Sequence, residues 1–257
     1  MSWWGKIIGG GFGFLVGGPL GAMLGASFGH QFDKGVAGLD NLNVGDPQRT
    51  QAAFFSACFS MMGYLAKADG HVSREEINLA RQVMDQMNLN DEQRKAAIEL
   101  FNQGKSDGFP LDEVLEQFRL ECQRRRNLAQ MFMEILISTA MADGKMDVAE
   151  KRSLIYIGEK LHFNQAQLEQ LINMVAAQQH YSGPQQTQAS LDDAYALLGI
   201  ATSSSDAEVK KAYRRLMSQH HPDKLVSKGL PEEMIKLATE KTQEIKAAYE
   251  QIKAARK

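Results

Sequence analysis

The sequence predicts an all-α protein with a single N-terminal transmembrane helix, a duplicated helical bundle and a C-terminal helical hairpin. Three observations support this. A long uncharged segment lies near the N-terminus, the sequence AKADGHVSREE returns in related form as AMADGKMDVAE, and no useful length of chain alternates apolar and polar residues as a strand does. We divide the chain into an anchor (1–33), a central domain (46–178), a flexible linker (179–190) and a terminal module (191–257).

The uncharged segment, from Ile7 to Gly29, is long enough to cross a bilayer. At a helical rise of ~1.5 Å per residue it spans a hydrocarbon core of roughly 30 Å. Trp3 and Trp4 lie just before it, where indole rings favour the headgroup region. A signal peptide would have a shorter apolar region and a cleavage site, and a buried core helix so rich in glycine would be marginal. We therefore predict a retained single-pass span.

Glycine recurs at every fourth position of this segment, so that a row of glycines turns slowly around the helix. Such a row lets two membrane helices approach closely, as in the GxxxG motif. We predict that the chain forms a homodimer through this row within the lipid bilayer. The alternative is that the glycines, together with Pro19, only permit a kinked span. The residues of the row are Gly9, Gly13, Gly17, Gly21 and Gly25.

The repeat in the central domain is explained by helix capping. Gly70 can end one helix in a left-handed conformation, and Ser73 with Glu76 can begin the next through a capping box. Asp147 and Glu150 occupy the equivalent positions of the second copy. Each copy is expected to be helix, turn and helix, and the two copies are expected to pack as a pseudo-symmetric bundle.

Asp69 and Asp143 are equivalent acidic residues in the two turns and are weak candidates for metal ligands. A calcium loop needs oxygen-bearing side chains at alternate positions and a glutamate at its end, and neither turn provides this pattern. We therefore predict no metal site and no cofactor. A metal-responsive sensor is kept as an alternative function.

The cysteines and methionines of the central domain are expected in its core. Cys58 and Cys122 lie among apolar residues and form no CxxC pair, which indicates buried free thiols in a reducing compartment. Methionines can line an adaptable groove, but at helical spacing core packing is the commoner outcome. The run from Arg124 to Arg126 is expected to be a solvated helix end, the alternative being contact with anionic lipid headgroups.

The terminal module contains two strong helical segments, one from about 205 to 219 and one from about 231 to 252. Ser205 and Glu208 form a capping box at the start of the first. Its buried stripe is predicted to consist of Val209, Ala212, Tyr213 and Leu216. Its exposed side carries like charges four residues apart, which mildly destabilise a helix and therefore suggest an acidic partner surface. These charges belong to Lys210, Lys211, Arg214 and Arg215.

The tripeptide His221-Pro222-Asp223 is expected in a loop between these two helices. Pro222 fixes the backbone of the loop, and Asp223 can offer a carboxylate to an arginine of a partner. A histidine after a helix could also serve only as a favourable charge at the helix C-terminus, but that would not explain the whole triplet.

The sequences DAYALLGI, EVKKAYRRLMSQHHPDK and QEIKAAYEQI resemble the first three helices and the loop of a J domain. This resemblance implies that the basic helix face and His221, Pro222 and Asp223 bind a DnaK-type chaperone and trigger its ATP hydrolysis. The central domain resembles the TerB-like helical domain in its paired ADG turns. The whole arrangement, with WGKIIGG, GKSDGFPL and HHPDKLVSKGLP, is similar to a family of membrane-anchored DnaJ-like proteins of Gram-negative bacteria.

Other functional classes have little support. A formal net charge of −2 gives no general attraction to nucleic acid. The sequence also contains no P-loop and no HExxH motif, either of which would indicate an enzyme. We expect a co-chaperone in the bacterial inner membrane, with a periplasmic N-terminus and cytoplasmic domains, because its partner needs ATP. The alternative is an adaptor or metal-responsive sensor that acts mainly through the TerB-like domain.

Overall fold

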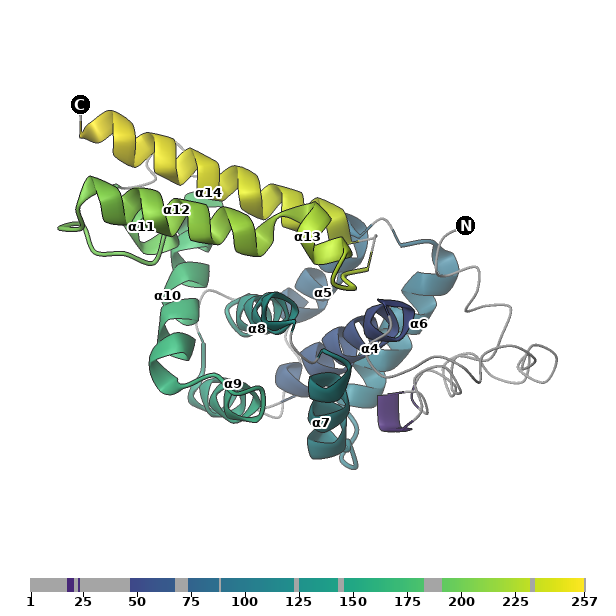
Figure 1. Ribbon diagram of the computed structural model, residues 1–257. Coiled ribbons are helices and arrows are strands. Elements are labelled where there is room, and N and C mark those ends of the chain that lie inside the picture. Colours follow the sequence, from purple (N-terminus) through teal and green to yellow (C-terminus); the bar gives the residue numbers. More distant parts are fainter. Residues whose placement is uncertain are drawn as a thin grey trace.

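The structure is a computed structural model that describes residues 18–20, 23, 47–67, 74–87, 89–122, 125–142, 146–182, 191–231 and 234–256. All regular secondary structure in these ranges is helical, which confirms the all-α prediction (Figure 1). The central domain contains α4 Pro47–Ala66, α5 Arg74–Gln86, α6 Asp91–Gly104, α7 Leu111–Glu121, α8 Arg126–Ala140, α9 Val148–Lys160 and α10 Gln165–Ser182. The terminal module contains α11 Leu191–Leu197, α12 Asp206–His220, α13 Pro222–Val226 and α14 Ile235–Ala255.

The helices of the central domain follow the internal repeat. Pairing Asp69 with Asp143 places the two copies in register. In this register α9 begins and ends at the positions equivalent to those of α5, α10 begins at the position equivalent to the start of α6, and α8 is equivalent to the C-terminal part of α4. The capping box at Asp147 is confirmed, because its side chain accepts from the backbone N–H of Glu150 at 2.9 Å and Glu150 Oε2 accepts from the N–H of Asp147 at 2.8 Å. Ser73 and Gly70 lie outside the described residues.

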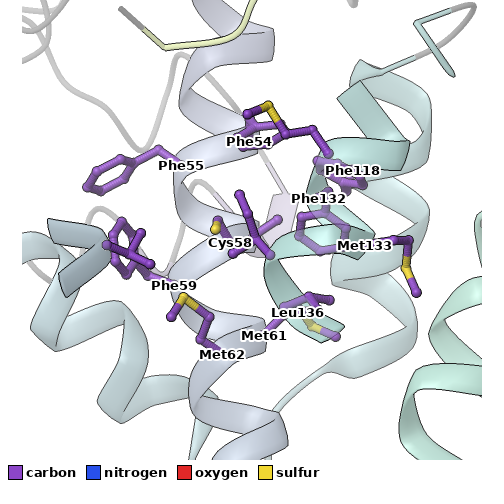
Figure 2. Packing of buried hydrophobic residues seen from close by; sticks show 14 of the residues in the cluster. Phe54, Phe55, Cys58, Phe59, Met61, Met62, Phe118, Phe132, Met133 and Leu136 are labelled. Atoms are coloured by element: carbon purple, nitrogen blue, oxygen red, sulfur yellow. The ribbon is translucent and has the colours of Figure 1, made fainter. Parts of the chain in front are cut away.

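The core of the central domain is centred on α4, which is buried along nearly its whole length. Figure 2 shows side chains of α4, α7 and α8 meeting there, and the rings of Phe118 and Phe132 lie 4.3 Å apart between centroids. Cys58 and Cys122 are buried and free, as predicted. Methionines belong to this core as expected, among them Met61, Met62, Met84, Met87, Met131 and Met133.

Helices α4 and α6 cross with almost no space between their backbones. A Cβ atom added to Gly63 would lie 1.9 Å from the carbonyl oxygen of Phe101, and one added to Gly104 would lie 1.8 Å from that of Ser60. Both glycines are therefore required by the crossing itself, because any side chain would occupy the position of the opposite backbone.

Most of the predicted anchor lies outside the described residues. Two of its described residues, Leu20 and Met23, are buried against the central domain. The N–H of Leu20 donates to Gln117 Oε1 at 2.9 Å, and Gln103 Nε2 donates to the carbonyl oxygen of Met23 at 3.1 Å. Among the described helices, none combines the length and the apolar composition needed to cross a bilayer. The predicted dimerisation residues outside the described part are Gly9, Gly13, Gly17, Gly21 and Gly25.

The terminal module packs against the central domain on two sides. Helix α10 continues to Ser182, so the linker predicted to begin at Gln179 starts inside this helix. Met174 and Ala177 of α10 belong to the same apolar cluster as α11, α12 and α14. The opposite end of the module, which includes α13, packs into the core of the central domain (Figure 1).

Candidate functional site

Helix α12 carries the residues predicted to bind a partner, and it begins as the sequence indicates. Ser205 is its N-cap, and its backbone N–H donates to Glu208 Oε2 at 2.7 Å. The hydroxyl of Ser205 accepts from the backbone N–H of Glu208 at 3.4 Å, which completes the capping box. The predicted capping box is therefore confirmed, and the helix runs one residue beyond the expected end, to His220.

One side of α12 is buried against the rest of the terminal module. Val209, Ala212 and Leu216 are buried there, as predicted. Tyr213 is only half-buried, and its ring stacks on that of Tyr249 from α14 with centroids 4.2 Å apart and an interplanar angle of 16°. This contact keeps α12 and α14 side by side, so that the opposite side of α12 faces outwards.

The outward side of α12 forms a basic ridge of four exposed side chains: Lys210, Lys211, Arg214 and Arg215. The ion pairs found among the described residues include none of the four. Four exposed positive charges on one face attract an acidic surface and repel a basic one. The ridge therefore has the charge and accessibility expected of a docking surface.

His221, Pro222 and Asp223 do not lie in an irregular loop, as expected from the sequence, but open the short helix α13. His221 is its N-cap and Pro222 its first residue, a position where the fixed φ and missing N–H of proline are well tolerated. The N–H of Leu225 donates to the carbonyl oxygen of His221 at 3.0 Å, and Lys224 Nζ donates to Ser218 Oγ at 2.7 Å. The motif is thus held in a defined turn at the end of α12.

The side chains of this turn are presented to solvent. The side chains of His221 and Asp223 are 46% and 91% exposed. His221 Nδ1 accepts from the backbone N–H of Asp223 at 3.2 Å, so a neutral ring carries its proton on Nε2. The turn can therefore offer one N–H donor and one carboxylate acceptor to a partner, next to the basic ridge.

Sequence reasoning missed a buried polar cluster directly behind this turn. Glu134 of α8 places Oε1 3.4 Å from His220 Nε2 and Oε2 3.4 Å from Lys241 Nζ of α14. Gln130 Nε2 donates to Glu134 Oε1 at 3.0 Å, and Lys241 donates to Gln178 Oε1 of α10. The one signal in the sequence was a charged residue inside the otherwise apolar run MFMEILI of α8.

Burial and the mutual placement of charges set the protonation of this cluster. Burial alone raises the pKa of Glu134, but His220, Lys241 and the hydrogen bond from Gln130 outweigh it and hold that pKa below its ordinary value. Burial lowers the pKa of His220, and the attraction of Glu134 does not compensate. Burial therefore favours the neutral imidazole of His220, while the surrounding polar and charged groups favour the carboxylate form of Glu134.

The weak metal candidates, Asp69 and Asp143, lie outside the described residues. Within the described ranges, no group of three or more histidine, cysteine, aspartate or glutamate side chains is placed to hold a metal ion. Of the run from Arg124 to Arg126, expected at a solvated helix end, Arg124 lies outside the described residues. Arg125 and Arg126 stand at the start of α8 and make contacts within the chain. Arg125 donates to Thr50 Oγ1, and Arg126 donates to Gln167 Oε1 at 3.0 Å.

Comparison with known proteins covers all three parts of the chain. Residues 1–41 match the family model of the co-chaperone DjlA transmembrane domain, residues 55–173 that of the tellurite resistance protein TerB, and residues 193–257 that of the DnaJ domain. The resemblances to a TerB-like domain and to a J domain are thereby confirmed.

The chain also aligns with relatives over nearly their whole length. The chain is 46% identical over 270 residues to the "Co-chaperone protein DjlA" of Photobacterium profundum, with 97% of this chain and 98% of the relative covered. It is 45% identical over 271 residues to the protein of that name from Coxiella burnetii, with 100% and 99% covered, and 42% identical over 266 residues to that from Escherichia coli O157:H7, with 98% of each covered. No solved structure matches the chain.

Proposed function

Because the chain belongs to the DjlA family, DnaJ-like co-chaperones with a membrane anchor, we propose that it stimulates ATP hydrolysis by a DnaK-type chaperone. The observation that carries this proposal is the adjacency of the exposed turn His221–Asp223 to the basic ridge of α12. The relatives are co-chaperones, so the hydrolysis itself belongs to the partner and this chain acts by binding it.

Binding would proceed in two parts with different chemistry. The basic ridge attracts an acidic surface over a distance of about a Debye length, ~8 Å at physiological salt, and so sets the rate and orientation of encounter. The turn then makes short-range contacts, in which Asp223 accepts from an arginine of the chaperone and His221 donates through Nε2. Ridge substitutions should therefore weaken binding, whereas turn substitutions should abolish stimulation after binding.

We further propose that the chain is single-pass in the bacterial inner membrane, with its N-terminus in the periplasm and its helical domains in the cytoplasm. The requirement of the partner for ATP supports this orientation, and the match of residues 1–41 supports the anchor. The glycine row at Gly9, Gly13, Gly17, Gly21 and Gly25 supports a homodimer through the membrane helix.

The test is single-turnover ATP hydrolysis by a DnaK-type chaperone with the full-length protein in lipid nanodiscs. We expect stimulation by the wild type, and its loss with His221→Gln at every concentration. Lys210→Glu with Arg214→Glu should instead raise the half-saturating concentration. Lys246→Glu with Lys253→Glu, the same charge change on the exposed side of α14, is the matched control. No stimulation by folded wild type would refute the proposal.

A further inference from the structure

We infer that Glu134 of the TerB-like domain is a positioning residue for the J-domain turn His221–Asp223, holding it in the orientation in which it meets the chaperone. The inference rests on the proposed function, because the effect of positioning is read through stimulated ATP hydrolysis. Glu134 does not contact the chaperone in this proposal. It acts through His220 and Lys241, its two partners in the J domain.

The buried carboxylate contacts both helices that flank the turn. His220 is the last residue of α12 and directly precedes His221, and Lys241 lies on α14. Glu134, His220 and Lys241 are only 6%, 2% and 7% exposed, so water screens their interaction weakly. A third contact acts nearby, since Asn127 Nδ2 of α8 donates to the carbonyl oxygen of Gln219 at 3.1 Å.

Apolar contacts on the far side of the turn also hold it against the TerB-like domain. Leu225, Leu230 and Met234 are fully buried and belong to the core of the TerB-like domain. Gln51 of α4 also reaches this segment, where its Nε2 donates to the carbonyl oxygen of Leu230 at 3.5 Å. The turn is therefore held from both sides, while the side chains of His221 and Asp223 stay exposed.

The internal repeat shows that the bundle does not itself need this charge. Ser56 and Ser60 of α4 stand where Gln130 and Glu134 stand in α8, in the register of the repeat. Both serines are buried and satisfied within their own helix, since Ser60 Oγ donates to the carbonyl oxygen of Ser56 at 2.8 Å. A buried carboxylate is much more costly to desolvate than a hydroxyl. The contact with His220 and Lys241 of the J domain explains why α8 carries one.

Helices α6 and α10, which are equivalent in the repeat, also differ in the size and polarity of one side chain. Gly104 of α6 closes tightly on α4, whereas Gln178 stands at the equivalent position of α10. Gln178 accepts from Lys241 and donates to Glu244 Oε2 at 2.5 Å, and both of these residues belong to α14. In the first copy, small residues thus allow the helices to pack closely. In the second copy, long polar side chains stand at the equivalent positions and contact the J domain.

The experiment uses the full-length protein in nanodiscs and measures stimulated ATP hydrolysis against co-chaperone concentration. Glu134→Gln keeps the shape of the side chain but leaves Lys241 buried without a counter-charge. We expect the maximal stimulated rate to fall roughly tenfold, because a displaced turn misaligns its contacts. The half-saturating concentration should change by less than about twofold, because the basic ridge remains exposed. Glu159→Gln, an exposed carboxylate on α9, is the matched control.

The double variant Glu134→Gln with Lys241→Met removes both charges and tests whether the buried pair is responsible. Lys241 borders a cavity of about 390 Å³, so a methionine has room there. Replacing both members of a buried pair by neutral residues is much less costly than removing one. We therefore expect the double variant to recover most of the stimulation lost in Glu134→Gln. Stimulation by folded Glu134→Gln equal to that of wild type would overturn the inference.

Amide hydrogen exchange distinguishes positioning from a general loss of stability. In Glu134→Gln, amides 221–230 should exchange about tenfold faster than in wild type while those of α4 keep their protection. Equal acceleration in both regions, or in neither, would overturn the inference. If wild type itself fails to stimulate the chaperone, the proposed function is wrong, and the exchange experiment still decides whether Glu134 fixes the turn.

Discussion

Gly104→Ala is the substitution for which the structure gives the clearest expected cost. The added methyl group would begin 1.8 Å from the carbonyl oxygen of Ser60 and would have to move beyond 3.0 Å, a separation that real Cβ atoms respect. The obstacle is backbone, so relief requires α4 and α6 to move apart. The reciprocal contact at Gly63, 1.9 Å for an added Cβ, shows that the helices are in close contact along this whole crossing.

The expected magnitude is a net loss of about 2 kcal/mol in the free energy of unfolding. Overpacking a close contact costs about 1–3 kcal/mol, and separating two helices belongs at the upper end of this range. Alanine regains up to about 1 kcal/mol in helix propensity, less at a helix end such as Gly104. For a domain of this size the loss corresponds to a fall in Tm of roughly 4–8 °C.

Thermal unfolding of the full-length protein in a mild detergent, followed by circular dichroism, measures this change. Gly108→Ala is the matched control, because a Cβ added there meets nothing within 4 Å. We expect the control to keep the wild-type Tm. A Tm for Gly104→Ala equal to that of Gly108→Ala would show that the helices separate freely, and would refute the reasoning.

Three further predictions follow from charge and burial. Lys210→Glu with Arg214→Glu should raise the half-saturating concentration for chaperone stimulation about tenfold at low salt and less at high salt. His220 has a lowered pKa when docked, so docking should be complete above its ordinary pKa of about 6.5 and weaken as pH falls below it. The protection factors of amides 221–230, which are corrected for the pH dependence of intrinsic exchange, should therefore fall between pH 7.5 and 5.5, and should not fall in His220→Gln. Burial raises the pKa of Cys58 to about 12 and also raises that of Cys122, so native protein should not react with maleimide. Maleimide labelling of Ser2→Cys should therefore report the side of the N-terminus.

The features that the sequence predicted well depend on neighbouring residues. The capping boxes at Ser205 and Asp147 and the exposed basic ridge follow from residues within one or two helical turns. The internal repeat added to these predictions, because the turn at Asp143 could be identified by its similarity to the turn at Asp69. The matching bounds of α5 and α9 show that the chain obeys the repeat at the level of whole helices.

The docking of the J domain could not be predicted in this way, because its contacts join residues far apart in the chain. Glu134 looks like one polar residue of an amphipathic helix until His220 and Lys241 are placed beside it. Leu225 and Met234 offered a further signal, since they are large apolar residues near a turn expected to be exposed. Their burial in the other domain explains them.

The burial of Leu225, Leu230 and Met234 has a geometric consequence for delivery of substrates. A J domain on a flexible tether samples many orientations, and the chaperone it recruits can meet a substrate from any direction. Here the turn is fixed to the central bundle, so a chaperone bound to it would adopt one orientation with respect to that bundle. A polypeptide held anywhere on the bundle would reach the chaperone at a constant distance and angle, and the surface that holds it could be sought along that direction.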